Sequence, residues 1–154
     1  MHFSFWMRLC SVLRGKKKWI PLYAIALKRY NHYKYKYGIC IPFNTKIDSG
    51  FYIGHFGCIV VNPSVIIGKN VNISQGVTIG AANRGPKAGV AIIGNEVYIG
   101  PGVKIVGAVY IGNNVAIGAN AVVTRDVPDN AVVAGIPAKI LSMNGAEGYV
   151  NRKV

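Results

Sequence analysis

Apolar residues recur along most of this chain with a spacing of six. From residue 41 onward an apolar residue opens each hexad, and these residues are Ile41, Ile47, Ile53, Ile59, Ile67, Ile73, Ile79, Ile93, Ile99, Ile105, Ile111, Ile117 and Val123. Glycine often follows directly, and a small or β-branched residue stands four places further on. A period of six fits neither an α-helix nor an alternating strand. It is typical of short strands joined by turns, three of which complete one coil of a three-sided prism.

The same pattern predicts how the coils stack. The first residue of each hexad should point inward and lie on its equivalent 18 residues away, as Ile99 on Ile117. Glycine and asparagine at the corners accept backbone angles that β-branched residues resist. The 13 hexads therefore predict between four and five coils, whose parallel ladders satisfy the backbone.

Two steps break the period. The step from Ile59 to Ile67 is eight, which predicts that two extra residues bulge one corner at residues 61–64. The step from Ile79 to Ile93 is fourteen, so eight extra residues should project as a loop. Loops on a stiff scaffold commonly carry function, although a plain surface excursion is the alternative.

The residues ahead of the repeats predict two helices, at 3–14 and about 20–37. Pro21 suits a first helical turn and Gly38 a C-terminal stop. An apolar stripe is expected to pack on the open end of the first coil, and it consists of Ile20, Tyr23, Ala24, Leu27 and Tyr30. A basic, aromatic surface facing anionic membrane lipids or an anionic glycan is a second interpretation, compatible with the first. The chain thus divides into a basic helical segment at 1–38, a repeat domain at 39–141 and a C-terminal tail at 142–154.

The net charge of +13 is concentrated in the first third of the chain. Residues 1–47 hold ten Lys and Arg and no acidic residue, whereas later residues hold eight basic and five acidic ones. The charge therefore describes that segment and not the whole protein. Basic residues among aromatic ones also fit nucleic acid, but nothing else in the sequence favours that partner.

Composition narrows the class of protein further. With 154 residues, 51% of them apolar, the chain suits one domain with a core and is too apolar for disorder. No apolar run reaches the roughly 18 residues that span a bilayer, and no cleavage site follows residues 16–27, so a secretory leader is rejected. The cysteines Cys10, Cys40 and Cys58 are odd in number and lack CxxC spacing. They predict a reducing, cytoplasmic compartment and neither a disulfide framework nor a zinc site.

Two segments carry a family resemblance. They are IGHFGCIVVNPSVIIGKNVNISQGVTIG at 53–80 and IGPGVKIVGAVYIGNNVAIGANAVVTRDVPDNAVVAGIPAKI at 99–140. Together they resemble the serine acetyltransferase branch of the hexapeptide acyltransferases, which includes O-acetyltransferases of capsule and exopolysaccharide pathways. The resemblance covers residues 38–141. It implies an all-β fold, a left-handed parallel β-helix with a short N-terminal helical segment, assembled as a homotrimer. It also implies acetyl-CoA as the acetyl donor and no metal.

His55, in the segment HFGCIVVNP, matches the residue that this family uses as general base. An acceptor hydroxyl is a poor nucleophile until a positioned base removes its proton as it attacks the thioester. An imidazole suits that work at neutral pH. The alternative is a corner histidine that is only hydrogen-bonded to backbone.

The family binds CoA along the crevice between neighbouring subunits of the trimer. By resemblance, the CoA-binding residues here are Gly100, Pro101, Ala119, Thr124, Arg125 and Lys139. Glycine and alanine leave room for the pantetheine arm, and the two cations are suited to the CoA phosphates. For each of them the alternative is an ordinary corner residue or a solvated cation. In the projecting loop, Asn83 and Arg84 are the candidates for binding the acceptor. The loop at 83–90 is expected to lie beside His55 or across a subunit boundary from it.

Three departures from the family pattern bear on the acceptor. The aspartate that supports the base in serine acetyltransferases falls at Cys40, and the aspartate just before the base falls at Gly54. The arginine–histidine pair that grips the serine carboxylate falls at Gly89 and Val90. The sequence therefore predicts transfer to a hydroxyl of a sugar or polysaccharide precursor, with L-serine as the alternative acceptor.

Other functions of the fold fit less well. A metal-dependent member of the fold would need three histidine ligands, and the repeat domain contains only His55. An ice-binding prism would show a ladder of threonines, which Thr45, Thr78 and Thr124 do not form. A non-catalytic module that binds CoA or a glycan is the remaining alternative from another class. Within an enzyme, we expect direct transfer without an acetyl-enzyme intermediate, since no GxSxG motif is present.

Overall fold

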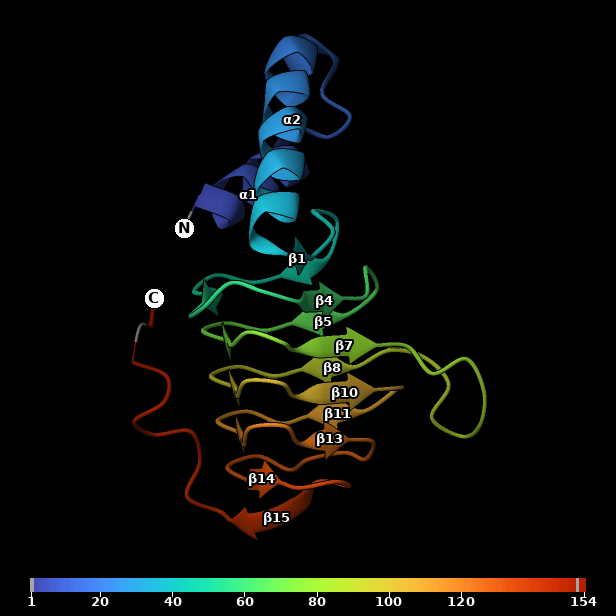
Figure 1. Cartoon of the computed structure of the whole chain (residues 1–154), viewed down its shortest axis with the longest axis vertical. Helices are drawn as coiled ribbons and strands as arrows, with labels where there is room; N and C mark the ends of the chain where they lie inside the picture. Colours follow the sequence, from blue (N-terminus) through green and yellow to red (C-terminus); the bar gives the residue numbers. More distant parts are fainter. Residues whose placement is uncertain (1, 152) are drawn as a thin grey trace.

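The computed structural model, which describes residues 2–151 and 153–154, opens with two helices packed against each other (Figure 1). They are α1 (His2–Leu13) and α2 (Ile20–Tyr37), joined through a short 3-10 turn at Lys17–Trp19. Both helices were expected. Pro21 lies in the first turn of α2, and Gly38 ends that helix with a φ of 61°, a left-handed angle that glycine adopts at little cost.

Short strands follow, and they form three sheets. Sheet A contains β1 (Ile39–Cys40), β4 (Ile59–Val61), β7 (Thr78–Gly80), β10 (Lys104–Val106) and β13 (Val122–Val123). Sheet B contains β2 (Lys46–Ile47), β5 (Ile66–Ile67), β8 (Ile92–Ile93) and β11 (Tyr110–Ile111). Sheet C contains β3 (Tyr52–Ile53), β6 (Asn72–Ile73), β9 (Tyr98–Ile99), β12 (Ala116–Ile117), β14 (Val132–Ala134) and the antiparallel β15 (Lys139–Ser142).

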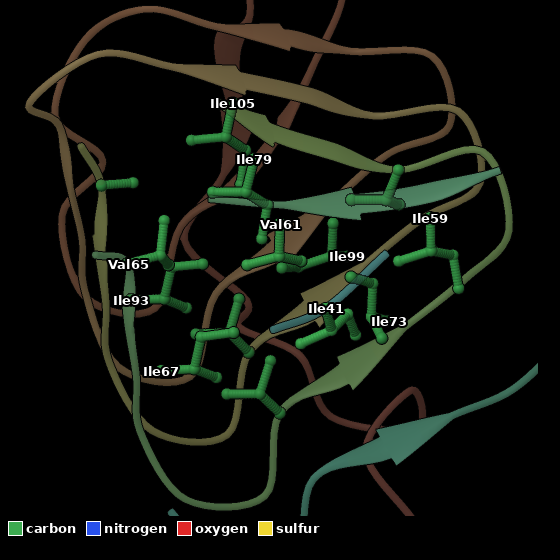
Figure 2. Packing of buried hydrophobic residues seen from close by; sticks show 14 of the residues in the cluster. Ile41, Ile59, Val61, Val65, Ile67, Ile73, Ile79, Ile93, Ile99 and Ile105 are labelled. Carbon is green, nitrogen blue, oxygen red and sulfur yellow. The ribbon is translucent and has the colours of Figure 1, made fainter. Parts of the chain in front are cut away.

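Up to β13, each strand pairs in parallel with the strand three places later in the chain. One circuit therefore crosses sheets A, B and C once each, which makes the repeat region a three-sided parallel β-helix. Ile99 lies between Ile73 and Ile117 in sheet C, as the hexad spacing predicted. Figure 2 shows the isoleucines of successive coils gathered inside the β-helix, where the apolar core lies. The parallel strands per sheet agree with four to five coils.

The predicted bulge at residues 61–64 is wrong in position. Val61, and not Ile59, lies opposite Ile79 in sheet A. The step of eight thus runs from Ile53 to Val61, and the two extra residues lengthen the corner at 54–58, between β3 and β4. Ile59 and Val61 stand two apart on one strand and are both buried, with 0% and 2% exposure, so the period alone could not tell which of them opens the hexad.

The predicted loop between Ile79 and Ile93 is present. It projects at the corner between sheets A and B, on the right in Figure 1. Ala82 and Gly89 bridge its base. The ammonium of Lys87 contacts the carboxylate of Asp126 at 2.8 Å, which holds the loop against a lower coil. That ion pair lowers the pKa of Asp126, chiefly through the hydrogen bond from Lys87 and also through the backbone N–H of Tyr110.

Helix α2 covers the first coil with only part of the predicted stripe. The hydroxyl of Tyr30 donates to the carbonyl of Ile41 at 2.8 Å, and Tyr23 and Leu27 pack against the core. Ile20 is 61% exposed and Ala24 is exposed, so the prediction is wrong for these two. The start of α2 stands away from the β-helix and has no coil beneath it (Figure 1). Within the described residues, no helix is both long and apolar enough to cross a bilayer.

The C-terminal tail, residues 143–151 and 153–154, runs back along sheet C (Figure 1). The N–H of Ala146 donates to Oδ1 of Asn114 at 3.0 Å, and Nδ2 of Asn72 donates to the carbonyl of Tyr149 at 3.0 Å. Ala146 and Val150 are buried against Ala116. The tail therefore covers the outer face of the sheet that leads to the corner of His55.

Candidate active site

The corner that carries His55 is the one that the two extra residues lengthen. It joins β3 to β4, and its backbone turns through left-handed angles at Gly57 and Cys58, with φ of 116° and 51°. His55 and Phe56 project into solvent from it. The ring of Phe56 lies 5.6 Å from the ring of Tyr37, so the end of α2 supports this corner.

A pocket of about 390 Å³ opens beside His55. Its walls come from sheet C, from the corners that join sheet C to sheet A, and from the tail. The lining residues are Tyr52, Gly54, His55, Asn72, Ile73, Ser74, Gln75, Tyr98, Pro101 and Tyr149. The imidazole has no hydrogen-bond partner among the described residues, so it is open to a bound molecule.

Asn72 is one of two buried polar residues that line this pocket, the other being Ser74. Asn72 as a residue is only 8% exposed because the tail lies over it. Nδ2 is occupied by the Tyr149 carbonyl, but Oδ1 is buried and has no hydrogen-bond partner within the described residues. A buried acceptor without a donor costs about 1–3 kcal/mol. A ligand with an O–H or N–H would recover that cost where a shift of the tail lets it reach Oδ1.

Two aromatic rings form one wall of the pocket. Tyr98 and Tyr149 stack with their ring centroids 4.7 Å apart and their planes 27° apart. Stacking of this kind contributes about 0.5–1.5 kcal/mol beyond the area buried. It fixes the middle of the tail beside the pocket.

Three of the predicted CoA-binding residues share an edge of the β-helix with His55. Gly100 and Pro101 follow β9 and Ala119 follows β12, so all three lie at corners between sheets C and A. Pro101 lines the His55 pocket itself. A side chain at Gly100 would meet the carbonyl oxygen of Ile117 at 2.7 Å, so close stacking of the coils requires glycine there.

The remaining predicted residues lie elsewhere on the chain. Thr124 and Arg125 follow β13, at a corner between sheets A and B, and Lys139 begins β15. Asn83 and Arg84 lie in the projecting loop, at the same A–B edge as Thr124 and Arg125. None of these five lines the pocket of His55. The expectation that the loop lies beside His55 is therefore wrong within one chain, and its other form, contact across a subunit boundary, stays a prediction.

The two cysteines near the site have different surroundings. Cys40 lies on β1 opposite Val60 and does not line the pocket. Cys58 is exposed, three residues after His55. Neither thiol is hydrogen-bonded to the imidazole within the described part of the chain.

Six polar or aromatic residues that line the pocket were not predicted from the sequence, and they are Tyr52, Asn72, Ser74, Gln75, Tyr98 and Tyr149. Asn72 and Tyr98 directly precede inward isoleucines, at positions that face outward from sheet C, and Gln75 lies at the next corner. An amide and a large ring at such positions were the available signal. Tyr149 could not be found in this way, because the tail has no repeat that predicts where it lies.

Known proteins resemble this chain in sequence. Residues 91–125 match the family described as bacterial transferase hexapeptide (six repeats). Serine acetyltransferase of Staphylococcus aureus (strain Mu50) is 37% identical over 133 residues, which is 79% of this chain and 62% of that protein. Serine acetyltransferase of Synechococcus elongatus is 35% identical over 108 residues, 70% of this chain and 44% of that protein.

A solved structure extends the likeness from the repeats to most of the chain. Serine acetyltransferase from Brucella abortus strain S19, in complex with coenzyme A, superimposes with a TM-score of 0.78 at 28% identity, over 92% of this chain and 55% of that one. The chain belongs to the hexapeptide-repeat transferases. Within that family it falls in the serine acetyltransferase-like branch. It spans only 44–62% of the length of these curated relatives.

Proposed function

We propose that this protein is an acetyl-CoA-dependent O-acetyltransferase with His55 as its general base. The observation that carries the proposal is the pocket that places an exposed imidazole beside Pro101 and the buried amide of Asn72. The chain belongs to a transferase family, and its similar relatives are serine acetyltransferases. This supports acetyl transfer as the reaction of the pocket. The relative crystallised with coenzyme A supports acetyl-CoA as the donor.

In the proposed reaction the imidazole takes the proton of the acceptor hydroxyl while its oxygen attacks the thioester carbonyl carbon. The tetrahedral intermediate then collapses, the carbon–sulfur bond breaks, and the departing CoA sulfur receives the proton from the imidazolium. The products are an O-acetyl ester and free CoA. No residue of the protein is acetylated in this sequence.

L-serine is the acceptor that the comparisons favour. The relatives described above are named serine acetyltransferases, so the sugar acceptor predicted from the sequence has less support. A sugar hydroxyl stays the second candidate on one observation. Gly89 and Val90 stand where the family holds the serine carboxylate, and neither side chain can bind an anion.

We further propose that a homotrimer completes the site. The corner of His55 and the corner of Arg125 lie on different edges of one β-helix, so one chain cannot offer both to the same CoA. A neighbouring subunit can. The outward residues Ile66, Ile92 and Tyr110 on sheet B are 39–47% exposed and form an apolar stripe suited to such an interface. As in the family, we propose that the coils wind with a left hand.

Release of the CoA thiol from acetyl-CoA tests the function. We expect steady turnover with L-serine. Nucleotide sugars and simple glycans are tested as other acceptors, and glycine is the control without a hydroxyl group. Turnover with a sugar and none with serine would select the second acceptor. CoA binding with no turnover on any hydroxyl compound would instead favour a non-catalytic module.

Asn72 allows the pocket to be tested separately from the base. Replacing Asn72 by Leu removes the buried Oδ1, and we expect KM for the acceptor to rise roughly 5- to 150-fold, the range for one buried hydrogen bond. The control is Asn70→Gly, because Asn70 has a left-handed φ of 56° that leucine would resist and glycine accepts. Asn70 is also buried and also holds the tail, through Val154, but it does not line the pocket. Equal effects of both changes would assign Asn72 to holding the tail only.

The CoA-binding residues have their own test. Arg125→Glu and Lys139→Glu should weaken CoA binding without changing the fold, because both side chains are exposed. Shortening the loop at Asn83 and Arg84 should alter use of the acceptor and leave CoA affinity nearly intact. A loss of CoA affinity on shortening would assign the loop to the donor.

A further inference from the structure

The start of α2 gathers basic and apolar side chains that the fold does not use. Lys16, Lys17 and Lys18 are consecutive and exposed, and they lead directly into Trp19 and Ile20. Trp19 is 47% exposed and Ile20 is 61% exposed. This group, with Leu22 and Ile25, is called the hairpin tip below. Figure 1 shows it at the end of the molecule opposite β15.

Packing of the hairpin does not explain these apolar residues. Helix α2 buries Ala26 and Tyr30 on its inner side, whereas Leu22 and Ile25 are 36% and 55% exposed. Large apolar side chains that gather at one exposed end mark a surface that binds something. The catalytic pocket lies on the β-helix, so the proposed reaction does not use the tip either.

A groove at the tip combines apolar walls with ammonium groups. It holds about 350 Å³ and lies between the end of α1 and the start of α2, lined by Leu13, Gly15, Lys16, Lys17, Ile20 and Tyr23. A lipid has the matching chemistry, because an acyl chain fits apolar walls and its phosphate attracts ammonium groups.

The charge around the tip favours an anionic partner. Residues 1–47 contain no acidic side chain, so the lysines have no carboxylate neighbour in sequence. Both ion pairs among the described residues lie on the β-helix and the tail, at Lys87–Asp126 and Lys153–Glu96. The positive charge of the tip is therefore not neutralised within its own segment.

We propose that the hairpin tip docks on an anionic phospholipid bilayer. The lysines contact lipid phosphates, while Trp19 and Ile20 enter the boundary between head groups and acyl chains, where tryptophan is favoured. The docking is peripheral. Because the tip lies at the end opposite β15, the docked β-helix extends away from the bilayer and its corners stay in water (Figure 1).

Sedimentation of the full chain with vesicles tests this proposal. We expect binding to phosphatidylcholine vesicles that contain phosphatidylglycerol, no binding to phosphatidylcholine alone, and loss of binding at high salt. Each lysine near such a surface contributes about 1 kcal/mol, a factor of roughly five. The double change Lys17→Gln, Lys18→Gln should therefore weaken binding roughly 25-fold.

The matched control removes the same charge from the other end of the same helix. Lys34→Gln with Lys36→Gln leaves the tip intact, and we expect a clearly smaller loss of binding. Trp19→Ser should also weaken binding, and the blue shift of tryptophan fluorescence on adding vesicles should disappear with it. Circular dichroism checks that each variant keeps its helices.

Four outcomes would overturn the proposal. Equal losses in the two double variants would show attraction by net charge alone. Equal binding to neutral and anionic vesicles would exclude recognition of anionic lipid. The absence of binding to anionic vesicles would exclude it too. Self-association without vesicles that Trp19→Ser abolishes would assign the tip to a second copy of the chain.

Discussion

Replacing His55 by alanine is the perturbation that best separates the proposed chemistry from folding. Loss of a positioned general base lowers the rate about 10²–10⁴-fold, which corresponds to about 2.7–5.4 kcal/mol of transition-state stabilisation. The reaction without the imidazole would rely on water to accept the proton.

The structure bounds the effect of this change on stability. His55 is exposed at its corner, has no hydrogen-bond partner within the described residues, and takes no part in the apolar core. Exposed substitutions of this kind change the free energy of unfolding by about 0.5 kcal/mol or less, or roughly 1–2 °C in the melting temperature. A large loss of turnover therefore cannot come from unfolding.

The assay follows thiol release at saturating acetyl-CoA and varied acceptor, with CoA affinity measured separately by calorimetry. His32→Ala is the matched control, because His32 is also an exposed histidine and lies on α2, away from the pocket. We expect kcat to fall in the first variant only, with CoA affinity preserved in both. Turnover of His55→Ala within a few-fold of the parent would refute the role of the base.

Three further predictions concern the thiols, the helical cap and the core. Cys58→Ala and Cys40→Ala should keep most of the turnover, and acetyl-cysteine found by mass spectrometry after incubation with acetyl-CoA alone would contradict direct transfer. Burial raises the pKa of Tyr30 from 10.0 to about 12, so the unfolded phenol ionises first and stability should fall as the pH rises from 10 to 12. Tyr30→Phe should lose about 1 kcal/mol at neutral pH and show less of that alkaline fall in thermal melts. Ile99 is 0% exposed, so Ile99→Ala should lower the free energy of unfolding by roughly 2–5 kcal/mol and Ile99→Val by roughly 0.5–1.5 kcal/mol, measured by urea titration. Equal losses in the two variants would contradict close packing.

Much of the fold could be predicted because one physical constraint repeats. Each coil must present an apolar residue inward at the same place, so the period of six located the strands, the loop after Ile79 and the stacking of Ile99 on Ile117. The two extra residues were placed at the wrong corner, at 61–64 and not beside His55, because the same constraint has two solutions there. Ile59 and Val61 both point inward, and only the pairing of Val61 with Ile79 decides between them.

The site was harder to predict because chain segments without a period contribute part of its lining. His55 and Pro101 follow from motifs, and both line the pocket. Tyr149 reaches that pocket through pairwise contacts with Tyr98 and Asn72, which no local pattern encodes. The position of Arg125 relative to the pocket depends on a second chain in the proposed trimer, and contacts between chains leave no spacing within one sequence.

The tail has a consequence for how the coils align. Near-identical isoleucine rungs allow a coil to slip past its neighbour with little loss of apolar burial, because every rung offers the same surface. The tail contacts four successive coils, at Asn130, then Asn114, then Tyr98, then Asn72. A slip of one strand spacing, about 4.8 Å, would break all of these contacts at the same time. Residues 143–151 and 153–154 thus favour one alignment of an otherwise repetitive stack of coils.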